Sequence, residues 1–327
     1  MENVIWRVGI IGAGHIAEKM AATLKGMDDM TCLAVASRSL EKAQAFAGPR
    51  DIPRAYGSYD ALLDDPDVDL VYVATPHSHH FDVTRKALEK GKACLVEKAF
   101  MANARQAKTI LDLSRSTGVF VAEAIWTRYL PVVQLIRDII ASGVIGKVRT
   151  ISATLSYEIS AKERILRPEL CGGALLDIGV YGINFVRAYC DSPIVRTASL
   201  CTKFDTGTDM SDSISFIMKD GTVGQVLSSA AAQGDNIGVI AGEKANIWVD
   251  DVNNPQVVRV YAKRHALLAE YPVPAQITGF EYQWRACRDA IKAGRIDPPQ
   301  MPHGEILYVM QVMDGLRRDW GVRFPMD

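Results

Sequence analysis

The chain has 327 residues, of which 48% are hydrophobic and 23% charged, and its formal net charge is −1. This composition is typical of a globular protein, and the length suffices for about two domains that each bury a core. A charge so close to zero provides no basic field to attract nucleic acid or an anionic membrane, and no stretch approaches the ~20 uncharged apolar residues that span a bilayer. We therefore expect neither nucleic acid nor a membrane as a partner.

The six cysteines are scattered along the chain and contain no C-x-x-C pair. The N-terminal residues run directly into an apolar, strand-like segment and lack the layout of a signal peptide. Both features predict reduced thiols in a cytoplasmic protein.

The first third of the chain alternates between strand-like and helical patterns. The runs that predict strands are 8–11, 32–36, 70–74, 93–96 and 119–122, and the helical patterns are 15–25, 40–47, 81–90 and 104–117. Asn103 is the expected N-cap of the last helix and Gly118 its stop. This alternation predicts a parallel sheet with right-handed crossovers, and so an α/β Rossmann nucleotide-binding domain over residues 1–122.

The turn after the first predicted strand reads VGIIGAGHIA, which contains the fingerprint G-x-G-x-x-G/A. Gly12 permits the tight turn, Gly14 lets the backbone approach a pyrophosphate, and the small Ala17 lets the helix lie close on the strand. His15 and Ile16 begin the helix, whose N–H groups and dipole favour an anion. The sequence therefore predicts a dinucleotide site here.

The end of the second predicted strand indicates which dinucleotide binds. Sites that prefer NAD usually place a carboxylate there, but residues 31–39 contain no acid and offer Ser37 and Arg38 instead. A hydroxyl and a planar cation suit a 2′-phosphate, so we expect NADP rather than NAD. The alternative is that Arg38 lies solvated in a loop and NAD binds.

Glu97 and Lys98 follow the strand predicted at 93–96, and open α/β sheets present their ligands at the carboxyl ends of strands. A lysine at such a place is either a surface cation or an active-site group.

The pattern changes after residue 122. Helices are expected at 132–142, 174–189, 280–293 and 305–319, and strands at 148–158 and between turn signals at 220–221, 241–243 and 252–255. We expect an α+β domain with a largely antiparallel sheet over residues 123–327, whose C-terminal helix could pack back on the first domain. Apolar residues alternate in 214–218 and 223–227, so one face of this sheet is buried; if the other face is also apolar, a second copy would cover it in a homodimer.

The helix at 174–189 begins with GGALLDIGVY. Asp177 and Tyr181 are spaced i,i+4 and would share one helix face. The simpler interpretation is an amphipathic helix with a buried, hydrogen-bonded tyrosine. Asp177, however, interrupts an apolar run, and a buried carboxylate needs a partner.

Four segments together, VGIIGAGHIA, the turn TPHSHH that ends at His80, VEKAF around Lys98, and GGALLDIGVY, resemble the Gfo/Idh/MocA oxidoreductases. The resemblance covers essentially the whole chain. Residues 122–131 together with GGALLDIGVY are most similar to the dimeric dihydrodiol dehydrogenase branch of that family, which also oxidises aldoses such as D-xylose with NADP.

The resemblance implies roles for three of these side chains. Lys98 would lie near the nicotinamide and the reacting carbinol, Tyr181 would exchange the hydroxyl proton, and Asp177 would be its acidic partner. A free tyrosine has a pKa near 10, and an adjacent ammonium would lower this pKa toward neutrality. Hydride would then pass between the substrate carbon and C4 of the nicotinamide.

The resemblance also implies contacts to the cofactor and the substrate. The expected cofactor contacts in the turns after the later strands are Thr75, His80, Glu97 and Lys98. Trp126 and Arg128 would wall the substrate site. The histidines at 77, 79 and 80 have no cysteine or carboxylate at ligand spacing, so we expect no metal.

One position departs from the family. The family motif is Glu-Lys-Pro, in which the lysine–proline bond is typically cis, whereas this chain has Ala99 after Lys98. The bond is therefore either trans, with the lysine re-aimed, or cis and held by its surroundings.

We expect an NADP-dependent oxidoreductase that transfers hydride between the nicotinamide and a carbinol or carbonyl of a sugar, polyol or cyclic trans-diol. One alternative is a sugar or inositol dehydrogenase that prefers NAD. The other is a cofactor-binding sensor or scaffold without activity, which the departure at Ala99 motivates and the joint presence of Lys98, Asp177 and Tyr181 opposes.

Overall fold

The computed structural model describes residues 5–327, which fall into two compact units. The first unit runs to Trp126 and adds Gln276–Met310 and Met326, and the second holds Thr127–Ala275, Gln311–Pro325 and Asp327. The expected boundary was 122/123, with the second domain running to the C-terminus. Helix α9 (Glu281–Lys292) belongs to the first unit because Trp284, Cys287 and Ala290 are buried in the same apolar core as the strands of that unit.

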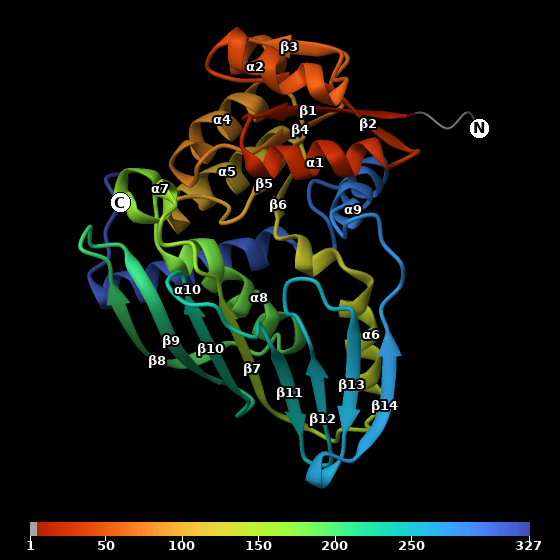
Figure 1. Ribbon diagram of the computed structural model, residues 1–327, viewed down its shortest axis with the longest axis vertical. Helices are drawn as coiled ribbons and strands as arrows, with labels where there is room; N and C mark the ends of the chain where they lie inside the picture. The colour runs from red at the N-terminus through yellow and green to blue at the C-terminus, as the bar shows by residue number, and fades with distance from the viewer. Residues whose placement is uncertain (1–4) are drawn as a thin grey trace. The chain divides into compact units, whose positions relative to one another are not determined.

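The first unit contains a wholly parallel sheet (Figure 1), in the order β3-β2-β1-β4-β5-β6. Its strands are β1 (Trp6–Ile11), β2 (Met30–Ala36), β3 (Arg54–Tyr56), β4 (Leu70–Val73), β5 (Cys94–Glu97) and β6 (Val121–Ala124). The strand order reverses between β1 and β4, which is where dinucleotides bind in Rossmann sheets. The predicted fold class is confirmed. Strand β3 was missed because it has three half-buried residues and no apolar run.

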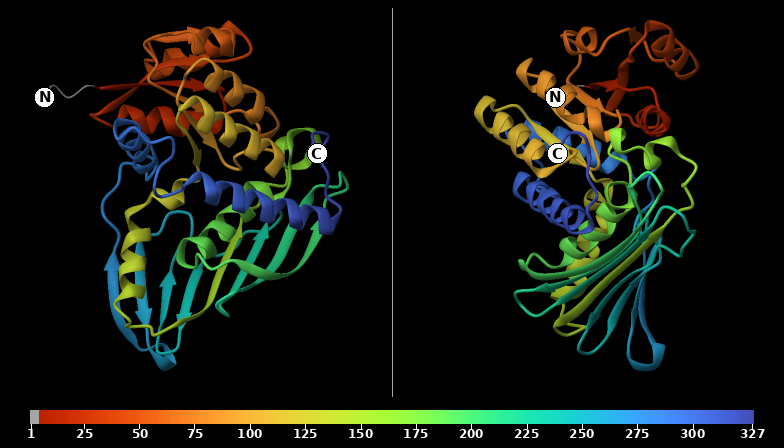
Figure 2. Two further views of the ribbon diagram at one scale, coloured as in Figure 1. Left: turned by 180° about the vertical axis from the view of Figure 1, so that it is seen from behind. Right: turned by 90° about the vertical axis from the view of Figure 1, so that its left-hand side faces the viewer.

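The helices of this unit flank the sheet (Figure 2). They are α1 (His15–Lys25), α2 (Leu40–Ala47), α3 (Tyr59–Leu63), α4 (His77–Glu89) and α5 (Ala104–Thr117), together with α9. Both predicted ends of α5 are confirmed: Asn103 accepts a hydrogen bond from the N–H of Gln106 at 2.9 Å, and Gly118 has a φ of +70°. Helix α4 begins four residues before the expected position, directly after Pro76, because the polar residues 77–80 show no apolar periodicity.

The second unit contains an eight-stranded sheet in the order β14-β13-β12-β11-β7-β10-β9-β8. Its strands are β7 (Val148–Ser156), β8 (Ile194–Lys203), β9 (Asp209–Met218), β10 (Val223–Ser229), β11 (Gly238–Gly242), β12 (Asn246–Val249), β13 (Val257–Tyr261) and β14 (Leu267–Pro272). Strands β7 and β10 pair in parallel and the other neighbours pair antiparallel, which confirms the predicted α+β class.

The helices of the second unit include α6 (Pro131–Ala141), α7 (Glu163–Leu166) and α8 (Val180–Tyr189), and α10 (His303–Trp320) contributes its C-terminal part. Residues 174–189 do not form one regular α-helix as predicted, because Leu175–Gly179 is π-helical. The stretch Pro168–Tyr189 passes a length and hydropathy test for a membrane span, but 83% of its most apolar window is buried inside the protein, as in a core helix.

Candidate active site

The glycine turn lies where β1 ends beside β4. Gly12 has a φ of +111°, and a Cβ there would lie 2.6 Å from the carbonyl oxygen of Ala74, so both the backbone conformation and the close approach require glycine. The N–H of Gly12 donates to the carbonyl of Ala36 at 2.9 Å, which ties the turn to β2. A Cβ on Gly14, by contrast, would meet no protein atom within 4 Å. The chain therefore leaves open the space into which α1 directs its first N–H groups.

This space suits the phosphates of a dinucleotide. Within residues 5–327 no side chain caps the N-terminus of α1, so its first N–H groups can bind an anion. Thr75, at the end of β4, is 8% exposed, and its hydroxyl has no hydrogen-bond partner among residues 5–327. Buried hydroxyls are rarely left unsatisfied, so a ligand at this edge would supply the missing bond.

Two polar side chains, Ser37 and Arg38, follow the end of β2. Ser37 is buried at this end, and Arg38 is exposed and forms no ion pair within the described residues. Burial raises the pKa of the neighbouring Tyr59, and the charge of Arg38 opposes that rise. His15 has an exposed side chain, 3.5 Å from Glu18. The Arg38 guanidinium is thus accessible beside the end of β2.

Ile16, the second residue of α1, packs against the apolar core of the first unit. Its side chain therefore supports the helix, and the part that can meet a cofactor is its backbone.

Side chains hold the backbone of the Lys98 segment at successive peptide groups. The N–H of Lys98 donates to Glu97 Oε2 at 3.2 Å, and His77 Nε2 lies 3.1 Å from the Lys98 carbonyl oxygen. The N–H of Phe100 donates to Glu123 Oε1 at 2.9 Å, and Glu123 is 1% exposed. The Lys98–Ala99 peptide bond is cis, so the structure has the second of the two geometries that the sequence left open.

His80 is fully buried beneath this segment and does not line the surface of the site. Its Nδ1 lies 3.1 Å from the carbonyl oxygens of both Ala99 and Phe100, and its Nε2 lies 2.8 Å from that of Thr75. Burial and the nearby His77 lower the pKa of His80 to about 3, although the three carbonyls favour the charged ring. The imidazole thus lies between the turn after β4 and the Lys98 segment, and its neutral form can donate a hydrogen bond to only one of the two.

Sequence reasoning did not identify Tyr72 and Glu123, which bind residues on either side of Lys98. The Tyr72 hydroxyl donates to Glu97 Oε1, and the Tyr72 ring meets that of Trp284 edge-on, with 5.2 Å between centroids. A carboxylate directly after the predicted strand 119–122, with apolar residues on both sides, is the signal that could have found Glu123. Tyr72 lies in an apolar run and looks like an ordinary core residue.

The second unit carries the other candidate side chains. Asp177 lies in the π-helical turn and Tyr181 in the first turn of α8, with exposed fractions of 8% and 9%. The expected face-sharing of these residues assumed a regular α-helix. The predicted need for a partner is met by Arg164 of α7, whose Nη1 lies 2.6 Å from Asp177 Oδ1.

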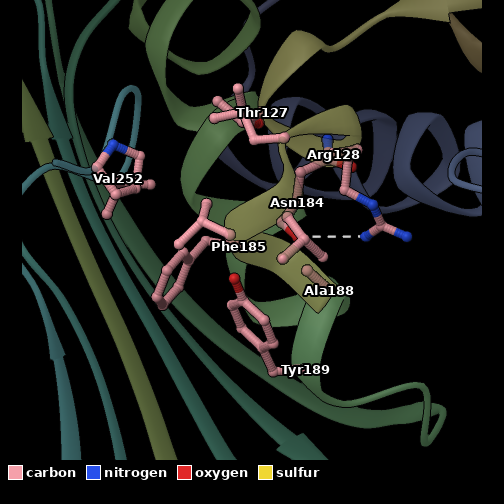
Figure 3. A pocket seen from close by; sticks show the side chains of 11 residues that line it. Thr127, Arg128, Asn184, Phe185, Ala188, Tyr189 and Val252 are labelled. Atoms are coloured by element: carbon pink, nitrogen blue, oxygen red, sulfur yellow. Dashed lines mark hydrogen bonds between the residues drawn. The ribbon is translucent and has the colours of Figure 1, made fainter. Parts of the chain in front are cut away.

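Trp126 and Arg128 fall into different units although two residues apart. Trp126 packs against Phe280 in the first unit, with 4.4 Å between the ring centroids. Arg128 is 7% exposed, and its Nη1 donates to the Asn184 carbonyl at 3.3 Å. Figure 3 shows Arg128 in a small, largely apolar pocket of the second unit, together with Phe185 and other residues of α8. Neither Asp177 nor Tyr181 lines this pocket.

Comparison with known proteins places the chain in a family. Residues 6–124 match the oxidoreductase family GFO_IDH_MocA, with its NAD-binding Rossmann fold, and residues 133–248 match the GFO/IDH/MocA C-terminal domain. The chain is 34% identical to a trans-1,2-dihydrobenzene-1,2-diol dehydrogenase of Xenopus tropicalis, over 97% of this chain and 98% of the relative. It is 33% identical to a D-xylose 1-dehydrogenase (NADP(+)) of Hypocrea jecorina, over 97% of this chain and 92% of the relative.

A solved structure gives the same result. A 3-ketoreductase from Actinomadura kijaniata, in complex with TDP-benzene and NADP, is 25% identical and has a TM-score of 0.84, over 96% of this chain and 97% of the other. The chain belongs to the GFO/IDH/MocA family of NAD-binding oxidoreductases. The resemblance drawn from its motifs is therefore confirmed, and the protein is a nicotinamide-dependent oxidoreductase.

Proposed function

We propose that the protein is an NADP-dependent dehydrogenase or reductase that acts on a sugar, polyol or cyclic trans-diol. The observation that carries the proposal is the position of the fixed Lys98 segment at the end of β5, one strand from the open glycine turn at β1 and β4. The relatives support the substrate class, because they are named for a cyclic diol and an aldose.

The choice of NADP rests on Ser37 and Arg38. The Arg38 guanidinium is exposed and has no carboxylate partner in the part of the chain that the structure describes, and residues 31–39 contain no acid. Both features fit a 2′-phosphate. Replacing Arg38 with alanine removes a charge-assisted hydrogen bond, and we expect the Kd for NADPH to rise about tenfold to 100-fold. The Kd for NADH should stay within about twofold, because NADH lacks the 2′-phosphate. Cofactor fluorescence measures both constants, and an equal change in the two would contradict the assignment.

The remaining predicted contacts form part of the same proposal. Gly12, Gly14, His15 and Ile16 would lie against the phosphates, with Thr75 and Glu97 at the neighbouring strand ends. His80 would act through the backbone that it holds. Trp126 and Arg128 would form walls of the substrate site.

Tyr181, Lys98 and Asp177 would carry the proton chemistry. Bound NADP supplies the hydride acceptor at C4 of its nicotinamide. Tyr181 would take the proton from the substrate hydroxyl during oxidation and return it during reduction. The Lys98 ammonium would lower the pKa of the Tyr181 phenol and orient the hydroxyl, and Asp177, paired with Arg164, would supply the compensating negative charge.

The outer face of the second sheet supports a homodimer. Leu200 of β8 lies opposite Ser213 of β9, which in turn lies opposite Leu227 of β10. Leu200 is 78% exposed and Leu227 is 47% exposed, and Ile217 and Val223 extend the apolar face beside them. We propose that a second copy covers this face.

Sedimentation of two variants tests the dimer. Leu200→Glu introduces a charge into the apolar face and should convert a dimer to a monomer. Leu267→Glu places the same charge at a leucine that is 55% exposed on β14 of the same sheet, and should leave the mass unchanged. A wild-type protein that sediments as a monomer would contradict the proposal.

We also propose that the protein is cytoplasmic. All six cysteines are free thiols, which fits a reducing compartment.

Turnover of a substrate panel tests the reaction. Aldoses, inositols and cyclic trans-diols are supplied with NADP, and the corresponding carbonyl compounds with NADPH, and the nicotinamide absorbance is followed. We expect turnover of at least one class. NADPH binding without turnover of any member would contradict the proposal and favour a cofactor-binding sensor.

A further inference from the structure

Two carboxylic acids, Asp209 and Asp212, lie on the buried face of β9. Both are fully buried. Positions three apart in a regular strand point to opposite faces of the sheet. Here the pairing with β8 shifts by one residue between Thr202 and Lys203, so Met210 is the extra residue of a bulge. The bulge brings both acids to the same side, facing the π-helical turn.

Asp209 binds the start of the helical stretch that carries the two candidate residues of the second unit. Its Oδ2 accepts a hydrogen bond from the N–H of Leu175 at 2.5 Å, and the backbone of Ala174 also donates to this carboxyl. Gly173 has a φ of +117°, and a Cβ there would overlap the carboxylate. The second glycine of the GGALLDIGVY motif is therefore required by the approach of Asp209.

Asp212 lies beside Asp209 and reaches the same helical turn through a serine. Its Oδ2 accepts from the Ser228 hydroxyl at 3.0 Å, and that hydroxyl would lie 3.1 Å from a Cβ on Gly179. The Oδ1 atoms of Asp209 and Asp212 have no hydrogen-bond partner among residues 5–327. The two carboxyls repel each other when both are charged, and a proton on either one removes that repulsion.

The surroundings of the two acids favour a protonated carboxyl. Burial raises the pKa of Asp209 to about 6, and Arg317 of α10 and the backbone donors only partly oppose this. Burial and the neighbouring Asp209 raise the pKa of Asp212 further. Arg317 is itself paired with Asp314 and Asp327. From β8, Cys201 interacts electrostatically with both acids, and Lys203 interacts with Cys201.

We propose that Asp209, supported by Asp212, is a positioning residue for the proposed reaction. It holds the π-helical turn that carries Asp177 and the first turn of α8 that carries Tyr181. Only the N-terminal N–H groups of a helix lack partners inside the helix, so one buried acceptor at that end fixes where the first turns lie. The inference rests on the proposed function through the role of Tyr181.

Two substitutions at Asp209 separate positioning from general stability. Asp209→Ala removes the acceptor, and we expect kcat to fall by about tenfold to 100-fold, since small displacements of a reacting group have such effects. The Kd for NADPH should stay within about twofold, because the glycine turn belongs to the other unit. Asp209→Asn keeps an oxygen for the N–H of Leu175 and is uncharged like the protonated acid, so it should restore kcat to within about threefold of wild type. If Asp209→Ala does not fold, Asp209→Ser takes its place, because its hydroxyl is too short to reach Leu175.

The pH profile of kcat/KM, measured with a substrate that the panel identifies, provides a readout that a purely structural role would not change. Displacement of Tyr181 from its activating charge should raise the apparent pKa of the basic group by about one unit in Asp209→Ala. Hydrogen exchange of residues 173–181 should be faster in the same variant. Ser211→Ala, which removes another hydroxyl of β9 that bonds to Ser229 instead, is the matched control and should match wild type.

The outcomes distinguish this inference from the proposed function. Wild-type kcat and pH profile in Asp209→Ala, or an Asp209→Asn variant as impaired as Asp209→Ala, would overturn the inference. So would a loss of kcat with an unchanged apparent pKa and weaker NADPH binding. Full turnover by Tyr181→Phe would contradict the proposed proton role and the inference together, whereas loss of turnover in Tyr181→Phe with normal kinetics in Asp209→Ala overturns the inference alone.

Discussion

The two segments that carry the candidate chemistry are held in place by different means. Around Lys98 the backbone is irregular, and side chains from β5, β6 and α4 bind its peptide groups one by one. Around Tyr181 the backbone is helical, so partners from outside are needed only at the helix ends, and Asp209 provides one at the N-terminal end. Buried peptide groups must be hydrogen-bonded in either case. Sensitivity to mutation should therefore be spread over several residues in the first unit and concentrated at a few residues in the second.

The largest expected effect on kcat comes from removing the proposed reacting side chains, one from each segment. Lys98→Ala and Tyr181→Phe should each lower kcat by about 100-fold to 10,000-fold, the usual contribution of general acid–base catalysis. Cofactor fluorescence should show NADPH binding retained in both. Tyr261→Phe on β13 is the control for tyrosine replacement and should keep wild-type kcat. If only one of the two variants loses turnover, the pairing of Lys98 with Tyr181 is wrong.

Glu123 tests whether side-chain hydrogen bonds hold the Lys98 segment of the first unit. Glu123→Ala leaves the buried N–H of Phe100 without a partner, which should lower the free energy of unfolding by about 1–3 kcal/mol. It should also lower kcat by about tenfold through displacement of Lys98. Urea unfolding and steady-state kinetics measure the two effects. Glu123→Gln keeps an acceptor oxygen and should recover most of both; an equally impaired glutamine variant would argue against the hydrogen bond as the cause.

Arg164 should show a smaller effect in the second unit. Its guanidinium pairs with Asp177 but its side chain is 44% exposed, so water can replace much of the interaction. Arg164→Ala should lower kcat by about threefold, and added salt should weaken wild type toward the variant. The matched control is Arg167→Ala, because Arg167 pairs with Glu163 at the surface. If Arg164→Ala lowered kcat as much as Tyr181→Phe, the Arg164–Asp177 ion pair would take part in the reaction and not merely position Asp177.

The two units should also respond oppositely to pH. His80 has its pKa lowered by burial to about 3, below the ~6.5 of an unfolded chain, so its contribution to stability is present above pH ~6.5 and is lost as the pH falls. Asp209 has its pKa raised to about 6, so its contribution is present below its unfolded pKa near ~3.9 and is lost as the pH rises through about 6.

Thermal unfolding between pH 4 and pH 8 would check these opposite signs. Relative to wild type, Asp209→Asn should gain stability toward pH 8, and His80→Gln should lose less stability toward pH 4. If both variants showed the same pH dependence of thermal stability, His80 and Asp209 would not be the groups that determine it.

Much of the fold followed from local patterns. The strand–helix alternation, the glycine turn and the two ends of α5 at Asn103 and Gly118 depend on residues that are neighbours in sequence, and the structure has them as predicted. The short β3 and the early start of α4 escaped detection because three half-buried residues and a run of histidines carry no apolar period. The π-helical turn was missed because a continuous apolar run has no period that distinguishes a π-helix from an α-helix.

Local sequence patterns were sufficient to predict the Rossmann sheet, the position of the glycine turn, the family and the candidates Lys98, Asp177 and Tyr181. How these candidates are held depends on contacts between residues far apart in the chain. Glu123 reaches Phe100 because β5 and β6 are neighbours, Arg164 meets Asp177 from another helix, and Asp209 faces Leu175 because of a bulge in β9. Helix 281–292 joined the first unit for a similar reason, through burial of Trp284 in that core. Periodicity and turn residues act over a few positions, whereas the partner of a buried polar group depends on sheet order and register, which no local pattern records.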